Sequence, residues 1–156
     1  MQKDEVNYYP EINQIALFLD IDNIGIRKYK GEISLITNSI KPWGKIAVKI
    51  AYGNSISQRA NLYQDLLNQH FKIAKPGYTP HKKNGADIQI AMDAIEVLQK
   101  NSSINTFAIA TGDSDFLALV NKLHDYGKNV IGIGSYRCTS KQLLSQIGRA
   151  SCRERV

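Results

Sequence analysis

The sequence predicts an α/β fold in which helices cover both faces of a parallel sheet of about five strands. Two apolar runs, residues 15–19 and 106–110, have the continuous pattern of strands that are buried on both faces. Segments of helical spacing alternate with strand-like segments along most of the chain. At 156 residues, the chain is long enough for one domain with a substantial core.

The strand-like segments are apolar or alternating runs that end at turn residues. They are residues 15–19, 45–52, 71–74, 106–110 and 129–133. Gly53 and Asn54 stop the second of these strands, and the Pro76-Gly77 pair follows the third.

The helical segments lie between these strands. They are residues 31–41, 57–69, 86–99, 115–126 and 139–146. Pro42 and Gly44 end the first helix. The predicted inward face of the second helix comprises Leu62, Leu66 and Leu67. The third helix has the clearest amphipathic pattern, and its predicted core stripe comprises Ile88, Ala91, Met92, Ile95 and Leu98.

Composition narrows the class of protein. With 43% hydrophobic and 22% charged residues the chain is ordinary for a folded domain, which argues against wholesale disorder. No apolar run reaches membrane-spanning length and the N-terminus has no apolar signal core, so we expect a cytoplasmic protein with no membrane partner. The net charge of +6 favours a polyanionic partner, but only weakly.

The two ends of the chain differ from its middle. Residues 1–13 are polar and are expected to form a flexible lead-in. Residues 147–156 look like one reading frame of a short-read sequencing adapter, so we expect a non-native tail there and a natural chain that is cut near Gln146. The predicted domain therefore comprises residues 14–146.

Aspartates follow the predicted strands at several places. Asp20 ends the first strand, Asp113 and Asp115 follow the fourth, and Asp87 opens the helix 86–99. Carboxylates that meet at one edge of a parallel sheet suit Mg²⁺ or Mn²⁺, which bind phosphate oxygens and activate water. For any single aspartate the alternative is a helix cap, and for Asp87 that alternative is about as strong.

Other polar residues are candidates for contacts with a nucleic acid. Asn23 would orient a phosphate or a water, and Ser114 lies at a helix N-terminus suited to an anion. Lys83 belongs to a basic loop that would track an RNA backbone, although a solvated loop is at least as common. Two aspartates are held in reserve: strand alternation turns Asp22 to the side of Asp20, whereas the helical wheel turns Asp93 away from the pocket and into solvent.

Four of these stretches carry a family resemblance. They are Leu19-Asp20-Ile21-Asp22-Asn23, Ala51-Tyr52-Gly53-Asn54, Lys83-Asn84-Gly85-Ala86-Asp87 and Thr111-Gly112-Asp113-Ser114-Asp115-Phe116. In order and spacing they resemble the NYN domain of the limkain type, a branch of the PIN-like nucleases. The resemblance extends over roughly residues 15–146.

The resemblance implies a three-layer α/β/α PIN-like fold and a metal-dependent ribonuclease. By position, the residues that would bind Mg²⁺ or Mn²⁺ and catalyse hydrolysis are Asp20, Asp87, Asp113 and Asp115, with Asn23 nearby. Family members also carry an acid at the position of Asp93. The expected partner is single-stranded RNA. A homodimer is a further expectation, as is a winged-helix RNA-binding domain beyond the point where this chain is cut.

Two other functions remain open at this point. A non-catalytic NYN module would bind RNA or regulate without cleaving it. The Asp20-Ile21-Asp22 stretch also fits the Asp-x-Asp motif of haloacid-dehalogenase-type phosphatases. This chain departs from the pattern of that family at two places. Ile24 stands where the family has threonine or valine, and Leu117 stands where the family has an aspartate.

Overall fold

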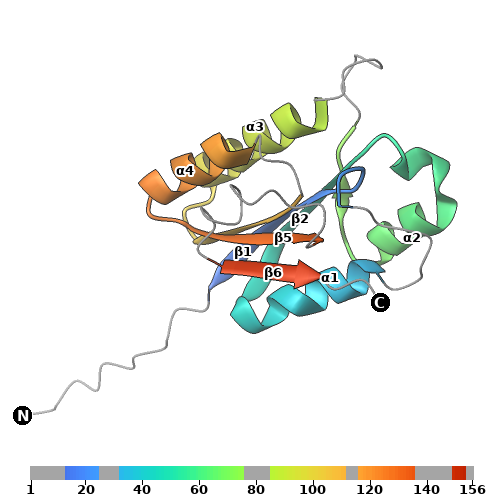
Figure 1. Cartoon of the computed structure of the whole chain (residues 1–156), viewed down its shortest axis with the longest axis horizontal. Coiled ribbons are helices and arrows are strands. Elements are labelled where there is room, and N and C mark those ends of the chain that lie inside the picture. The colour runs from blue at the N-terminus through green and yellow to red at the C-terminus, as the bar shows by residue number, and fades with distance from the viewer. Residues whose placement is uncertain (1–12, 25–31, 76–84, 112–115, 136–148, 154–156) are drawn as a thin grey trace, which may run out of the picture.

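The strands and helices form three layers, with a sheet between two pairs of helices (Figure 1). The computed structural model describes residues 13–24, 32–75, 85–111, 116–135 and 149–153. The strands are β1 (Gln14–Asp20), β2 (Lys45–Tyr52), β3 (Lys72–Ile73), β4 (Thr106–Ala110), β5 (Asn129–Ser135) and β6 (Arg149–Arg153). The helices are α1 (Glu32–Ile40), α2 (Ala60–Asn68), α3 (Gly85–Lys100) and α4 (Leu117–Asp125).

The sheet confirms the predicted α/β/α class. All paired strands are parallel, in the order β3-β2-β1-β4-β5-β6. The chain begins in the middle of the sheet at β1, runs outward to β3, and then returns to the other side of β1 to form β4. The direction in which strands are added therefore reverses between β1 and β4, which is where open α/β sheets bind ligands.

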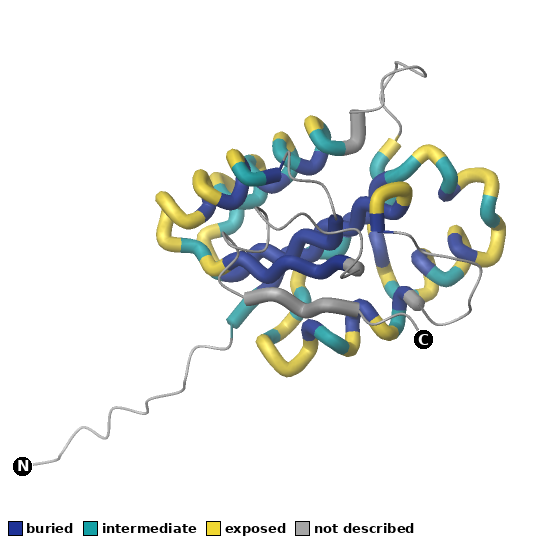
Figure 2. Tube along the Cα trace, viewed as in Figure 1, coloured by how far each residue is buried: buried dark blue, intermediate teal, exposed yellow. Residues whose placement is uncertain are grey.

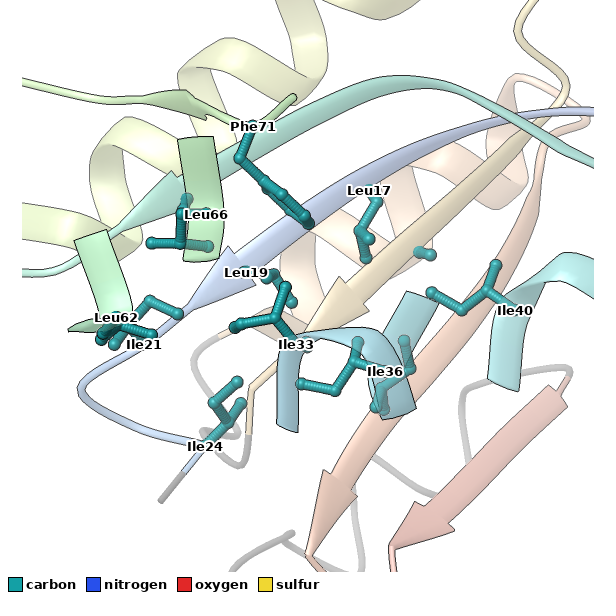
Figure 3. Packing of buried hydrophobic residues seen from close by; sticks show 14 of the residues in the cluster. Leu17, Leu19, Ile21, Ile24, Ile33, Ile36, Ile40, Leu62, Leu66 and Phe71 are labelled. Atoms are coloured by element: carbon teal, nitrogen blue, oxygen red, sulfur yellow. The ribbon is translucent and has the colours of Figure 1, made fainter. Parts of the chain in front are cut away.

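The side chains of β1 alternate between two hydrophobic clusters. Leu17 and Leu19 pack with α1 and α2 in the first cluster, which Figure 3 shows. Ala16 and Phe18 pack with α3 and α4 in the second. Both faces of the central strands are thus covered, and Figure 2 shows these strands in the colour of buried residues. This two-sided burial explains why the first strand is a continuous apolar run.

The core stripe predicted for the third helix is correct in part, because Ala91, Ile95 and Leu98 pack against the second cluster. Ile88 is 60% exposed and Met92 is 66% exposed, although both belonged to the predicted core stripe. The buried face of α3 is instead centred on Ile90 and Ala94, which are both fully buried. Apolar residues surround more than half of this helix, so the spacing alone left its rotation ambiguous, and packing on the sheet decided it. Similarly, Leu67 of α2 was predicted to face inward but is 42% exposed.

Among the described residues the sheet has six strands, one more than the roughly five predicted. The additional strand, β6, pairs with β5 and lies in the segment that was set apart as a tail. The predicted final helix, residues 139–146, and most of the predicted lead-in lie outside the described residues. Within the part of the chain that the structure describes, no helix has the length and apolar character needed to span a membrane.

Candidate functional site

Asp20 is a fully buried carboxylate at the carboxyl end of the central strand β1. Its Oδ2 atom accepts a hydrogen bond of 2.7 Å from Asn23 Nδ2 and one of 3.2 Å from Thr111 Oγ1. Thr111 follows the last residue of β4, so this second bond joins the ends of the two strands at which the sheet reverses direction. Asp20 therefore lies at the position where this class of fold binds ligands.

The turn after β1 orients the Asp20 side chain. Its backbone carbonyl accepts hydrogen bonds from the amides of Asn23 and Ile24, at 3.2 and 3.1 Å. This closes the turn and brings the Asn23 side-chain amide to Asp20. Asn23 was predicted to orient a phosphate or a water, whereas the contact that the structure shows is with the Asp20 carboxylate. Thr111 also supports this carboxylate and was not assigned a role from the sequence, because 91 residues separate the two.

Asp87 lies in the first turn of α3, and this turn is at the carboxyl edge of the sheet (Figure 1). The helix packs against β1. Asp87 is half-buried, and its Oδ1 atom is shielded from solvent, as is Oδ1 of Asp20. A carboxylate in this turn is also favoured by the helix dipole. Asp87 thus lies in the layer of α3 and α4. Asp20 faces this layer, because it alternates along β1 with Ala16 and Phe18, which pack there.

Asp93 is not the solvated residue that the helical wheel predicted. Its side chain is half-buried, and its Oδ2 atom accepts a 2.7 Å hydrogen bond from the Tyr52 hydroxyl. Tyr52 is the last residue of β2 and pairs in register with Asp20. Burial raises the pKa of Tyr52 well above its usual range, and the hydrogen bond to Asp93 raises it further, so the hydroxyl remains protonated and donates.

Asp22 does not converge with Asp20. Strand β1 ends at Asp20, so the alternation that was expected to bring Asp22 to the same side stops before it. Its exposed carboxylate instead accepts hydrogen bonds from the Asn54 amide at 2.8 Å and from the Ser55 amide and hydroxyl. The Asp20-Ile21-Asp22 stretch therefore lacks the converging pair that a phosphatase of the Asp-x-Asp type would need.

The remaining predicted site residues lie outside the described residues. They are Lys83, Asp113, Ser114 and Asp115. Within the described ranges no three histidine, cysteine, aspartate or glutamate side chains form a group that would hold a metal ion. Of the four predicted ligands, the structure describes Asp20 and Asp87, and it places Thr111 against Asp20 at the start of the segment that carries the other two.

Comparison with known proteins identifies the family. The family model of the NYN domain matches residues 14–150 of this chain. The chain belongs to the NYN family. NYN domains are part of the PIN-like nuclease superfamily, whose members generally use divalent metals.

One curated protein and one solved structure are similar to this chain. It is 30% identical over 124 residues to the uncharacterized protein MJ0482 of Methanocaldococcus jannaschii. That match covers 79% of this chain but 48% of the relative, so the chain spans about half of the relative's length. The crystal structure of VPA0982, a protein of unknown function from Vibrio parahaemolyticus, has a TM-score of 0.73 and 22% identity. The structural match covers 99% of this chain and 97% of the Vibrio protein, and it supports the fold.

The side chains that the structure describes fit a hard divalent cation. Asp20 and Asp87 supply carboxylate oxygens, which are the ligands that Mg²⁺ and Mn²⁺ prefer. An oxygen of each residue is shielded from solvent, and low exposure strengthens the attraction between a carboxylate and a cation. The two residues fit the cation by the chemistry of their oxygen ligands and by their position at the carboxyl edge of the sheet, where β1 and β4 end.

Proposed function

We propose that this NYN domain is a metal-dependent ribonuclease that hydrolyses phosphodiester bonds of single-stranded RNA. The observation that carries the proposal is the burial of Asp20 at the point where the sheet reverses direction, with its carboxylate oriented by Asn23 and Thr111. A fully buried carboxylate is rare in a protein core unless it has a function or a partner. Membership in a family of the PIN-like nucleases supports the same assignment.

Four aspartates form the proposed site. Asp20 and Asp87 would hold Mg²⁺ or Mn²⁺ together with Asp113 and Asp115. The covalent chain supports this grouping, because Asp113 is two residues from Thr111 and two residues span at most about 7 Å. When bound, the metal would polarise the scissile phosphate and lower the pKa of a water.

The residues around the aspartates have distinct proposed roles. Asn23 and Thr111 hold the Asp20 carboxylate in one orientation through its Oδ2 atom. Lys83, four residues before Asp87, would contact the RNA backbone, and Ser114 would contact a phosphate at the start of the following helix. The net charge of +6 would favour the approach of RNA.

The test is incubation of labelled single-stranded RNA with the full chain, with Mn²⁺, with Mg²⁺ or with a chelator. We expect cleavage that requires the metal. The variants Asp20→Asn and Asp113→Asn should each lower the cleavage rate by more than about 100-fold, the upper end of what loss of an outer-shell partner costs. Asp113→Asn should leave the fold intact or more stable, because it relieves repulsion between carboxylates.

A matched control is Asp125→Asn, which neutralises an exposed aspartate in the last turn of α4. This variant should cleave like the wild type. If Asp113→Asn unfolds the protein, the functional assignment of that residue is wrong. RNA binding without cleavage in either metal would favour the non-catalytic module instead.

A further inference from the structure

Tyr52 joins the sheet to α3 through a directional contact. It is the last residue of β2, it is 1% exposed, and its ring packs in the second cluster with Phe18 and Ile90. Its hydroxyl crosses from the sheet to the helix and donates to Asp93, 41 residues further along the chain. Because Tyr52 pairs in register with Asp20, this contact is made directly beside the proposed site.

The helix needs such a contact, because the packing around it is not directional. Hydrophobic contacts such as those of Ile90 and Ala94 favour burial of a face but tolerate small rotations and shifts. A metal site requires its ligands to be placed within about 0.5 Å. A hydrogen bond weakens steeply when its angle changes, so it fixes a rotation that apolar packing leaves loose.

The spacing of the two aspartates of α3 argues against both binding the same ion. Asp87 and Asp93 are six residues apart, which separates them by about 9 Å along the helix axis and about 120° around it. Side chains that meet at one ion from one helix are three or four residues apart. Asp93 is held by Tyr52, whereas Asp87 lies in the first turn on the other side of Ile90.

We propose that Tyr52 is a positioning residue that, through its hydrogen bond to Asp93, fixes the rotation of α3 and so places Asp87 at the metal site. This inference rests on the proposed function for the identity of the site. Asp93 is then the attachment point of the helix and not a metal ligand. Mutation of outer-shell partners of this kind typically costs 10- to 100-fold in metal affinity or activity.

The experiment measures the Mn²⁺ dissociation constant of the full chain by calorimetry, without RNA. Tyr52→Phe keeps the ring and removes the hydroxyl, and it should raise the dissociation constant by about 10- to 100-fold. Asp93→Ala should have a similar effect, and the double variant should be no worse than either single one, because one contact is lost in all three. In the metal-free protein, hydrogen exchange in the first two turns of α3 should be faster in Tyr52→Phe than in the wild type.

Asp93→Asn separates positioning from ligation. The asparagine amide keeps an oxygen that can accept the hydrogen bond from the Tyr52 hydroxyl, so this variant should bind Mn²⁺ better than Asp93→Ala does. Tyr63→Phe is the matched control, because Tyr63 is 44% exposed on α2, and the first cluster packs α2 on the opposite face of the sheet. It should not change the dissociation constant.

Three results would overturn the inference. The first is wild-type Mn²⁺ affinity in a folded Tyr52→Phe variant. The second is a loss in Asp93→Asn as large as that in Asp20→Asn, which would make Asp93 a ligand. The third is a wild-type chain that binds no Mn²⁺. A domain that binds Mn²⁺ with the expected dependence on Tyr52 but cleaves no RNA would refute the nuclease and leave the positioning role standing.

Discussion

Asp20 and Asp22 are two residues of the same type, two positions apart, with opposite surroundings. Asp20 is fully buried and is held by side chains from its own turn and from the end of β4. Asp22 is exposed and binds the loop that follows β2. Gly53 makes room for this second contact. Its φ of +151° is strained for other residues, and a Cβ there would lie 3.1 Å from Asp22 Oδ1.

Replacement of Asp22 should therefore affect stability and not catalysis. Asp22→Ala removes the acceptor for the Asn54 amide and for Ser55, and should lower the free energy of unfolding by about 1 kcal/mol. Metal-dependent RNA cleavage should persist at the wild-type rate. Urea unfolding and the cleavage assay check both, with Asp20→Ala as the variant that loses cleavage. A variant that keeps its stability but loses cleavage would return Asp22 to the proposed site.

At the scale of the elements, α2 and α4 end in the same way with different residues. His70 follows α2 with a φ of +63°, and Gly127 follows α4 with a φ of +72°. In both cases the next amide, of Phe71 or Lys128, bonds back to a carbonyl five residues earlier at 3.0 Å. This is the Schellman motif, in which the residue with positive φ is usually glycine.

Substitutions at these two positions should change the free energy of unfolding in opposite directions. His70→Gly relieves a left-handed backbone conformation, and it should raise the free energy of unfolding by about 1 kcal/mol. Gly127→Ala should lower it by about 1 kcal/mol through the backbone alone, because a Cβ there meets nothing within 4 Å. Denaturant unfolding of both variants gives the two values. Equal signs would mean that side-chain contacts, and not the caps, decide the result.

The rotation of α3 is testable with a matched pair of isoleucines. Ile90 is fully buried whereas Ile88 is 60% exposed. Ile90→Ala should cost about 2–5 kcal/mol of unfolding free energy, and Ile88→Ala should cost less than about 0.5 kcal/mol. Thermal or urea unfolding measures both. A larger loss for Ile88 would restore the stripe that the amphipathic pattern predicted.

At the scale of the whole molecule, the order of the strands places the site. Because β1 and β4 are neighbours in the sheet but more than 80 residues apart in the chain, Asp20 and Thr111 meet only in the folded state. The two clusters that hold this sheet together are built, among the described residues, from positions between Ile15 and Ile133. Strand β6 lies at the edge, paired with β5.

Removal of residues 147–156 should leave the fold in place, because it takes away a strand at the edge of the sheet and leaves the pairing among β1 to β5. We expect a cooperative thermal transition lowered by about 4 °C or less, which corresponds to about 1 kcal/mol for a domain of this size. Circular dichroism of the full chain and of the chain ending at Gln146 makes the comparison. Loss of the transition would show that β6 is integral to the sheet.

The sequence by itself determined the class of the fold, the strands β1 and β4, and the family. These properties are local: a run buried on both faces is apolar throughout, and motifs are read in order along the chain. It also identified Asp20 and Asp87 as candidates, because strand ends and helix starts have recognisable residues. The roles of Asp113, Asp115, Lys83 and Ser114 remain predictions.

Only the tertiary structure decided which face of α3 is buried, where Asp22 and Asp93 point, and which neighbours hold Asp20. The contacts of Asp22, Asp93 and Thr111 that settle these points join residues 32, 41 and 91 positions apart. Helical spacing fixes which side chains share a face but not which face meets the sheet, when several faces are apolar. Thr111, which holds Asp20, and Tyr52, which holds Asp93, lie at the ends of strands whose neighbours are set by the topology of the sheet. This topology is not a property of any one segment.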